Sequence, residues 1–259
     1  MTPSQRRQEI VAIIRQRGRA TVDELAERLD ISRETIRRDL TRLAQSGLVH
    51  KFHGGASLPM TTGEGPFRAR MSKHALEKAR IAVEAARLVA PGETVFVDTG
   101  STTIYFAEQL AKVEGLTVIT NSTEIARIID HSGKGCRAFM LGGEYHSGNH
   151  QTVGSMAIAQ ARLFRAHHCF LAIGALDVRT GVMDYNIEEA QLARAMIEQA
   201  ETLTILVDSS KFGAIASFEV CPLHCIDNLV CDAEPDSKLR AALEENNVMV
   251  RVAQAEDQS

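Results

Sequence analysis

Hydrophobic residues recur every three or four positions in three successive stretches near the N-terminus. The first stretch covers 4–17, the second covers 21–29, and the third opens at Ser32. This spacing places the hydrophobic side chains on one face of a helix. Asp30 and Ile31 interrupt the pattern between the second and third stretches. The pattern predicts three helices around one small core, with a short turn between the last two.

The third helix has a hydrophobic stripe and a polar outward half. Ile36, Leu40 and Leu43 form the stripe and are expected to pack on the preceding helices. The polar half is rich in groups that contact DNA phosphates or guanine edges, as in a helix that enters the major groove. Residues 48–52 then indicate a short strand, and 53–55 the turn or end of a two-stranded wing. The candidate DNA-contacting residues are Thr21, Ser32, Arg33, Thr35, Arg37, Arg38, Arg42, Lys51 and His53.

An alternative gives these arginines no DNA role. Glu34 and Arg38 are four residues apart on one helix face, which suits a surface ion pair. The distribution of charge favours DNA binding for the set as a whole. Residues 1–59 hold 11 Lys+Arg and 7 Asp+Glu, a balance of +4, whereas the remaining residues hold 18 and 26, a balance of −8. A basic head on an acidic body is expected when the head alone meets a polyanion.

Beyond the head, predicted strands alternate with predicted helices. Residues 58–66 are rich in Pro, Gly and Thr and indicate a linker between domains 1–57 and 67–259. A long helix is predicted over 73–89, where it docks on the second domain or pairs two chains. Strands are predicted at 95–97, 116–120, 138–141, 169–173, 203–207, 228–231 and 248–252, with helices at 102–110, 123–130, 157–163 and 188–199. This alternation is typical of a mainly parallel α/β sheet covered by helices.

Polar and glycine-rich segments follow several of these strands, and ligands of such sheets bind where the strands end. The segment 98–103, DTGSTT, opens a helix, so its amides and hydroxyls suit a phosphate. A tight turn with ordinary capping hydroxyls explains that segment equally well. Asn121, Gly142-Gly143, Gly174 and Lys211 follow other strands and offer groups that bind a phosphorylated sugar. One shared pocket would account for all of these segments.

Two sets of motifs resemble one protein family. ISRETIRRDLTRL followed by KFHGGA is similar to the N-terminal winged helix-turn-helix of the DeoR/GlpR family of bacterial transcriptional regulators. VDTGSTT, ITNS, LGGE, IGA and VDSSKFG resemble its C-terminal sensor domain, which is similar in fold to ribose-5-phosphate isomerase. The resemblance covers nearly the whole chain. It implies a repressor of sugar or polyol catabolism that leaves double-stranded operator DNA on binding a phosphorylated sugar or polyol. By this resemblance the effector-binding residues are Asp98, Gly100, Ser101, Thr102, Thr103, Asn121, Gly142, Gly143, Gly174 and Lys211.

One position departs from that family. In the run EAQLAR, residues 189–194, members commonly carry a lysine directly before the arginine, and this chain has Ala193. If that lysine holds the effector or a neighbouring chain in relatives, this protein does so differently, and the identity of the effector stays open. Glu189 and Arg194 are equally compatible with structural roles, because an acid near a helix start and an arginine on an exposed face need no ligand.

Two other functions compete with an effector-controlled repressor. A sugar-phosphate isomerase with a DNA-binding head needs a carboxylate base and a group that stabilises the enediolate, and Asp98, Glu144, Asp208 and Lys211 are available. The paired acidic motif of such isomerases is not found in the sequence, so no catalytic residue and no cofactor is assigned. The other function is an activator, or a DNA binder without an effector. The predicted pocket argues against the latter, while repression and activation differ by the position of the operator.

Composition narrows the class further. No hydrophobic run approaches the roughly 20 residues of a membrane span, and the start MTPSQRRQEI lacks a signal-peptide core, so a cytosolic protein is expected. Five cysteines are an odd number, which argues against a disulfide framework. The cluster Cys221, His224, Cys225 and Cys231 fits core packing better than a zinc site. Because one winged head reads only a few base pairs, we expect a homodimer or homotetramer that holds heads at half-site spacing.

Overall fold

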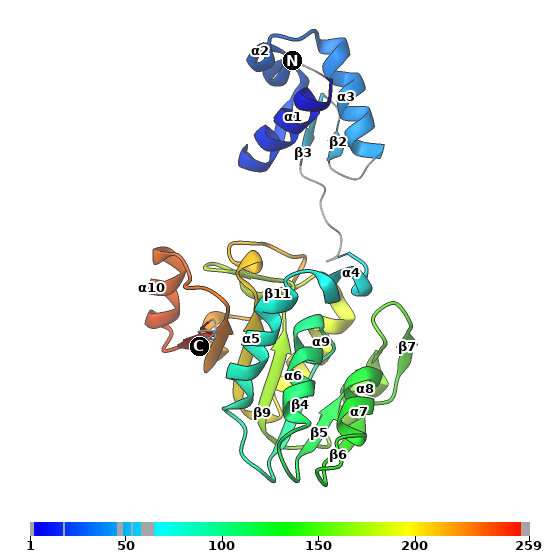
Figure 1. The fold of residues 1–259 in the computed structure, drawn as a ribbon, viewed down its shortest axis with the longest axis vertical. Coiled ribbons are helices and arrows are strands. Elements are labelled where there is room, and N and C mark those ends of the chain that lie inside the picture. The colour runs from blue at the N-terminus through cyan, green and yellow to red at the C-terminus, as the bar shows by residue number, and fades with distance from the viewer. Residues whose placement is uncertain (1–2, 18, 46–48, 53, 58–64, 255–259) are drawn as a thin grey trace, which may run out of the picture. The chain divides into compact units, whose positions relative to one another are not determined.

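The computed structural model describes residues 3–17, 19–45, 49–52, 54–57 and 65–254. The chain forms two compact units, Met1–Thr62 and Gly63–Ser259, which we call the head and the body (Figure 1). The boundary between the units falls inside the predicted linker 58–66, of which 58–64 lies outside the described residues.

Three helices and a small antiparallel sheet make up the head. The helices are α1 (Pro3–Arg17), α2 (Val22–Leu29) and α3 (Arg33–Gln45), and the strands are β1 (Arg19–Thr21), β2 (His50–Phe52) and β3 (Gly55–Ser57), in the order β1-β3-β2. Ile10 and Ile14 of α1 pack with Leu25 of α2 and Ile36 and Leu40 of α3 in one buried cluster, as their helical spacing predicts. The sheet has one strand more than the predicted two-stranded wing, because the residues just before α2 pair with β3.

Side chains at the helix ends shape the turn between α2 and α3. Thr21 and Glu24 form a capping box, in which the Glu24 amide donates to Thr21 Oγ1 at 3.2 Å and the Thr21 amide donates to Glu24 Oε2 at 2.7 Å. Asp30 ends α2 with a φ of 52°, in the left-handed region. The Thr35 amide then donates to Ser32 Oγ at 3.4 Å, so Ser32 caps the start of α3 as predicted.

A buried ion pair ties α3 to α1. Asp39 lies on the inward side of α3 with 3% of its surface exposed, and its Oδ2 lies 2.5 Å from Arg6 Nε. Arg7 Nη1 lies 3.7 Å from Oδ1 of the same carboxylate. Removing one partner of such a pair typically costs about 3–5 kcal/mol, because it leaves an uncompensated buried charge. Asp39 therefore fixes how α3 sits on the head from its inner side.

Seven parallel strands form the central sheet of the body. In sheet order they are β15 (Met249–Val252), β14 (Asn228–Cys231), β12 (Ala200–Val207), β9 (Ala166–Ala172), β4 (Thr94–Val97), β5 (Thr117–Thr120) and β6 (Arg137–Met140). Each corresponds to a strand predicted from the sequence, so the prediction of a mainly parallel sheet is confirmed. In this arrangement the carboxyl ends of all seven strands meet at one edge of the sheet.

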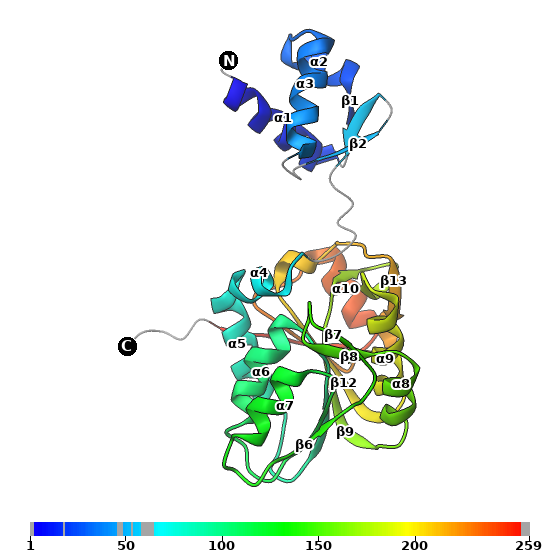
Figure 2. The same ribbon diagram turned by 90° about the vertical axis from the view of Figure 1, so that its right-hand side faces the viewer.

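Helices cover both faces of this sheet (Figure 2). α5 (Ala75–Ala86), α6 (Ser101–Leu110) and α7 (Thr123–Asp130) pack on one face, and α8 (Ser155–Ala161), α9 (Ile187–Ile197) and α10 (Ser237–Glu245) pack on the other. Side chains alternate along the strands, so Val95 and Val97 of β4 join the first layer and Phe96 joins the second. The strand ends therefore project from a three-layer core that is well packed on both sides.

The long helix predicted over 73–89 is instead two helices. α4 (Phe67–Ser72) and α5 are separated at Lys73 and His74, where His74 has a φ of 54°. Lys78 stabilises the break from a buried position. Its Nζ donates to the carbonyl oxygens of Arg70 at 2.5 Å and of Lys73 at 2.8 Å. The lysine ammonium thus supplies hydrogen-bond partners for carbonyls that the end of α4 leaves without helical ones.

Short antiparallel strands add features that the sequence pattern does not reveal. β7 (Glu144–His146) and β8 (Gln151–Val153) form a hairpin, while β10 (Ala175–Asp177), β11 (Gly181–Asp184) and β13 (Phe218–Cys221) form a three-stranded sheet. β7 and β8, like β10 and β11, follow one another with no helix between them, so the alternation of strands and helices that predicts the central sheet does not mark them. The hairpin reaches the end of β5, where the Thr152 amide donates to the Asn121 carbonyl oxygen at 2.9 Å.

Candidate functional sites

The outward face of α3 presents arginines to solvent. The side chains of Arg37 and Arg38 are 64% and 74% exposed, and Arg33 and Arg42 are exposed as well. The opposite side of the helix packs into the core of the head. The arginines therefore form a cationic face on one helix, which suits the phosphates and base edges of a DNA groove.

Ion pairs on this face are weak. Glu34 carboxylate oxygens lie 3.9 Å from a guanidinium nitrogen of Arg37 and, separately, of Arg38, so the surface ion pair considered as an alternative is present. Exposed helical pairs contribute only about 0.2–0.5 kcal/mol. Arg33 is held more closely, with Nε 2.7 Å from Asp23 Oδ1 of α2. Because their ion pairs with Glu34 are weak, Arg37 and Arg38 remain able to contact DNA.

The other candidate DNA-contacting residues fall into two groups. Thr21 and Ser32 are exposed, but their hydroxyls cap α2 and α3, and Thr35 Oγ1 lies 2.9 Å from Ser32 Oγ. Their observed contacts shape the turn, and a DNA contact by them stays a prediction. Lys51 belongs to β2, but its side chain lies outside the described residues, as does the whole of His53.

A pocket opens at the carboxyl ends of the central strands. Segments that follow β4, β9 and β12 contribute to it, together with α4 and residues near the starts of α5 and α9. Five basic side chains and three acidic ones take part. The lining consists of Arg70, Lys73, His74, Lys78, Thr99, Gly100, Ser101, Thr102, Ala172, Ile173, Asp184, Glu189, Leu206, Val207, Asp208, Ser210 and Lys211.

The first turn of α6 lines this pocket. Its N-cap residue is Gly100, and no side chain of the described chain caps the turn. The sequence offers Thr103 as a capping hydroxyl, but Thr103 does not cap the amides of this turn. Its Oγ1 donates to the carbonyl oxygens of Asp98 at 2.9 Å and of Gly100 at 3.0 Å. The amides of the first turn, with Ser101 and Thr102, therefore offer the pocket an arrangement that favours an anion.

Two predicted glycines have packing reasons for being glycine. A Cβ at Gly100 would lie 2.4 Å from the Ala172 Cβ of the neighbouring strand. A Cβ at Gly174 would lie 2.8 Å from the ring of Tyr185. Both distances are too short for real atoms, so any larger residue forces these segments apart. The close approach is between parts of the chain, a different reason from the approach to a ligand that the sequence suggested.

Lys211 reaches the pocket from the segment after β12. Asp208 directly follows that strand and is buried, and its Oδ1 accepts hydrogen bonds from the Ser210 amide at 3.2 Å and from the Ser210 hydroxyl. This cap begins the short 3-10 helix Ser209–Lys211. The carboxylate of Asp208 thus shapes the loop that carries the lysine to the pocket.

Six of the candidate effector-binding residues do not line the pocket. Asp98 Oδ1 accepts a hydrogen bond from the Ala172 amide at 3.0 Å, which joins the ends of β4 and β9. Asn121 is 3% exposed, and its Oδ1 accepts from the Thr99 amide at 3.0 Å. These side chains hold neighbouring strand ends together. The others outside the lining are Thr103, Gly142, Gly143 and Gly174.

Four basic residues of the pocket are missing from the sequence-based set. Arg70, Lys73, His74 and Lys78 come from α4 and the region up to the first turn of α5. The run RARMSKH at 68–74, directly after the predicted linker, is the signal that marks most of them. A short basic run is usually a solvated surface, so the sequence alone does not bring it to the strand ends.

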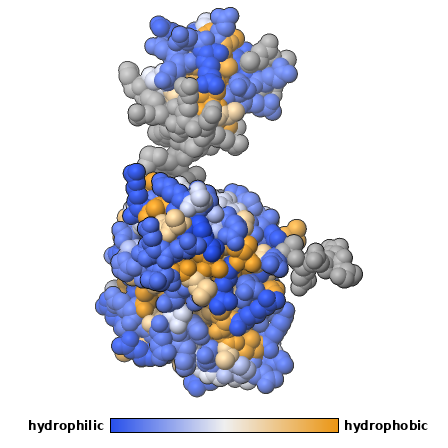
Figure 3. Space-filling view, turned by 90° about the vertical axis from the view of Figure 1, so that its left-hand side faces the viewer, coloured by the Kyte–Doolittle hydropathy of each residue, from blue (hydrophilic) through white to orange (hydrophobic). Residues whose placement is uncertain are grey.

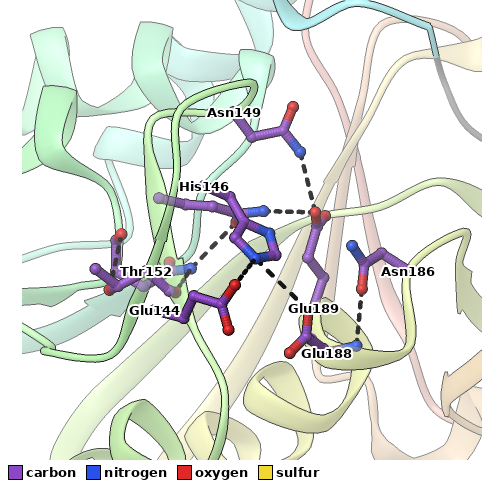
Figure 4. A network of polar contacts seen from close by, with 9 residues as sticks. Glu144, His146, Asn149, Thr152, Asn186, Glu188 and Glu189 are labelled. Atoms are coloured by element: carbon purple, nitrogen blue, oxygen red, sulfur yellow. Dashed lines mark hydrogen bonds and ion pairs between the residues drawn. The ribbon is translucent and has the colours of Figure 1, made fainter.

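A network of hydrogen bonds connects two lining residues of the pocket, Glu189 and Arg70, and Figure 4 shows its part around Glu189. Glu189 Oε1 of α9 accepts from Asn149 Nδ2 at 3.0 Å and from Gln151 Nε2 at 2.6 Å. Gln151 Oε1 accepts from Asn121 Nδ2 at 3.3 Å, and Asn149 Oδ1 accepts from Arg70 Nη2 at 3.0 Å. The network therefore runs from the end of β5, through the β7–β8 hairpin, to α9 and α4.

The position where the resemblance leads one to expect a lysine is buried. Ala193 of α9 is 8% exposed and belongs to the hydrophobic core. Arg194 donates to the carbonyl oxygens of Glu219 and, at 3.3 Å, of Val220 in β13. Arg194 thus fastens α9 to the small sheet, whereas Glu189 both joins the network and lines the pocket.

The cysteines act as core residues. All five are free, and burial raises the pKa of the Cys221 and Cys231 thiols to about 12. Both thiols are therefore neutral at pH 7 and behave as small hydrophobic groups. Within the described ranges, no three His, Cys, Asp or Glu side chains are grouped to hold a metal ion. No helix in those ranges combines the length and the apolar character needed to cross a bilayer.

Both units match known sequence families. The DeoR-like helix-turn-helix domain matches residues 6–62, and the DeoR C terminal sensor domain matches residues 73–233. The glycerol-3-phosphate regulon repressor of Escherichia coli K12 is 29% identical over 252 residues, which cover 97% of this chain and 100% of that protein. The HTH-type transcriptional regulator GolR of Listeria innocua is 30% identical over 255 residues, which cover 98% of this chain and 100% of that protein.

A solved structure with a related arrangement is ribose 5-phosphate isomerase A from Methanocaldococcus jannaschii, with 17% identity, a TM-score of 0.40, and coverage of 54% of this chain and 55% of that chain. The family matches are more informative, because they account for both units in chain order and extend over nearly the full length of the relatives. The chain therefore belongs to the DeoR family and is a DNA-binding regulator of transcription, not an enzyme.

Proposed function

We propose that this protein represses a carbohydrate or polyol catabolic operon and leaves its operator when it binds a phosphorylated sugar or polyol. The pocket at the strand ends carries this proposal. It combines the uncapped first turn of α6 and Lys211 with the carboxylates of Asp184 and Glu189. Amides and ammonium groups suit a phosphate, while carboxylates suit hydroxyl groups. One relative, the glycerol-3-phosphate regulon repressor, is named for a compound of this class.

DNA binding is assigned to α3 and to the basic head around it. Arg37 and Arg38 are the residues most suited to guanine edges or phosphates, because they are exposed and bound only by weak ion pairs. Specific affinity then requires more than one head, since each reads only a few base pairs.

We assign the pairing of heads to association of the bodies as a homodimer or homotetramer. Leu76 of α5 is 79% exposed and Met249 of β15 is 58% exposed. Figure 3 shows hydrophobic residues gathered on one face of the body among hydrophilic surroundings. Patches of this kind commonly mark contacts between proteins.

Control by the effector follows from linkage between two arrangements of the assembly. A ligand that binds one arrangement more tightly shifts the population toward it by its difference in affinity. In this proposal the effector favours the arrangement that does not hold the heads at half-site spacing, so occupancy of the pocket releases the operator.

A thermal-shift screen of the full chain against phosphorylated sugars and polyols tests the effector class. A ligand at 100 times its Kd stabilises the folded state by about 2.7 kcal/mol, so a true effector raises the Tm by several degrees. The matched control is the same compound without its phosphate, which is expected to give no shift. A screen in which no phosphorylated compound shifts the Tm, or in which the dephosphorylated partners shift it equally, would contradict the proposal.

A further inference from the structure

We infer that Arg70 and Lys73, next to the linker in the chain, bind the anionic group of the effector. The inference rests on the proposed function, because it assigns further residues to the same pocket. Both side chains line the pocket, Arg70 from α4 and Lys73 from the break that follows it. Neither belongs to the strand-end segments that carry the family motifs.

Local charge points to an anion. The residues from 60 onward carry 18 Lys+Arg against 26 Asp+Glu, a balance of −8. Against this acidic background, the pocket lining brings together Arg70, Lys73, Lys78 and Lys211 with His74. The same lining holds the carboxylates of Asp184, Glu189 and Asp208, so its four Lys and Arg side chains exceed its acidic ones by one. A local excess of positive charge in an acidic domain favours an anion.

Arg70 is held in place at the pocket wall. Its guanidinium lies 5.2 Å from the centroid of the Phe67 ring, and its Nη2 donates to Asn149 Oδ1 at 3.0 Å. Phe67 is itself buried in the core of the body. Because one edge of the guanidinium is fixed, the group is positioned before the ligand arrives, which reduces the entropy lost on binding a phosphate.

Side chains from α5 and α6 form hydrogen bonds with the backbone of α4 and of the break that follows it. Lys78, a lining residue, donates from Nζ to the carbonyl oxygens of Arg70 and Lys73. Tyr105 of α6 donates from its hydroxyl to the Met71 carbonyl oxygen at 3.0 Å. An anion in the pocket attracts the ammonium of Lys78 and the guanidinium of Arg70, and both hold α4 in its present position.

We therefore expect binding of a ligand in the pocket to change the hydrogen bonds that hold α4. Arg70 connects through Asn149 to Glu189 of α9, so a ligand that contacts either charged group alters the same set of hydrogen bonds. α4 begins at Phe67, directly after the predicted linker 58–66. A change in its attachments therefore occurs close to the linker along the chain.

Isothermal titration calorimetry of the full chain with inorganic phosphate tests the inference. The variants are Arg70→Gln and Lys73→Gln, and the matched control is Arg68→Gln. Arg68 is exposed on the same helix and does not line the pocket. We expect each of the first two variants to weaken phosphate binding roughly tenfold, equivalent to about 1.4 kcal/mol, and the control to bind as the wild type does. Lys73 is exposed, so its variant tests the idea even if Arg70→Gln disturbs the fold.

Two results would overturn the inference, and they differ in what else they affect. If Arg70→Gln and Lys73→Gln bind phosphate as tightly as the wild type does, α4 is not part of the anion site, and the proposed function is unaffected. Wild-type protein that binds neither phosphate nor any phosphorylated compound removes both. Hydrogen exchange provides a second readout, in which phosphate slows exchange across 67–78 in the wild type and has no such effect in Arg70→Gln. Equal exchange with and without phosphate in the wild type counts against the role of α4.

Discussion

The head and the body use their charged residues in opposite ways. In the head, the arginines of α3 project from one continuous helix, and the side chain of Arg38 is 74% exposed. In the body, the pocket draws on residues as distant in sequence as Arg70 and Lys211, and several are fixed by hydrogen bonds. An exposed helix suits a long polyanion that covers it, whereas a small ligand must be enclosed to gain enough contacts.

The difference extends to stability. The two units have separate hydrophobic cores, one around Ile36 and Leu40 and the others on the two faces of the seven-stranded sheet. We expect packing in the core of the head not to contribute to the free energy of unfolding of the body, and packing in the body not to contribute to that of the head. DNA binding and effector binding should therefore respond to different substitutions.

The largest effect is expected from a cavity in the head. Ile36→Ala removes a fully buried side chain and should cost about 2–5 kcal/mol in the free energy of unfolding of the head. Hydrogen exchange during a urea titration measures each unit separately. The body should keep its protection and its response to phosphate. Loss of protection in both units at the same urea concentration would show that they unfold together.

Arg38→Ala should weaken operator binding by about 1–3 kcal/mol without changing the stability of the head. The reason is that the side chain is exposed and its ion pair with Glu34 is long, at 3.9 Å. Fluorescence anisotropy with a labelled operator measures the loss, and a flatter dependence on salt identifies a phosphate contact. Arg28→Ala, the same charge removed from α2, is the control and should have a smaller effect. Equal losses for the two would mean that overall charge, not α3, determines binding.

Lys211→Ala should raise the concentration of effector needed for operator release by about tenfold, since one charge-assisted hydrogen bond is lost. Operator affinity without effector should stay at the wild-type value, because the lysine lies in the body. Thr102→Val offers a milder change in the same pocket. Reduced operator affinity in either variant would contradict the separation of the two functions.

The smallest effect concerns the competing ion pair on α3. Glu34→Gln removes contacts of 3.9 Å with Arg37 and Arg38 and should cost at most about 0.5 kcal/mol of stability. It also removes a negative charge from the face assigned to DNA, so operator affinity should rise. A fall in operator affinity would mean that Glu34 contacts the DNA directly.

Contiguous features of the fold were readable from the sequence. Helical spacing placed Ile36 and Leu40 inward and Arg37 and Arg38 outward, and the alternation of strands and helices predicted the parallel sheet. The break at Lys73 and His74 was not readable, because it is stabilised by the side chain of Lys78 and not by a local helix-breaking residue. β1, the additional strand of the head, was not predicted either, because its partner β3 is distant in sequence.

The pocket was only partly predictable. Gly100, Ser101, Thr102 and Lys211 line it as expected for strand ends. Asp98 is also at a strand end, but its carboxylate accepts a hydrogen bond from the next strand, and sequence position does not reveal which way a loop side chain turns. The basic residues of α4 and α5 were missed because their approach to the strand ends depends on tertiary contacts such as the burial of Phe67.

The central claim is that a small anion in the body controls the hold of the head on DNA. Its most direct test is fluorescence anisotropy of a labelled duplex from the promoter beside the gene, titrated with the best phosphorylated compound from the thermal-shift screen. We predict release from the wild-type protein and, at the same concentrations, retention by Lys211→Ala, with equal affinity for the duplex before the compound is added. Release of the two proteins at equal concentrations of the compound, or no release of the wild type, would contradict the claim.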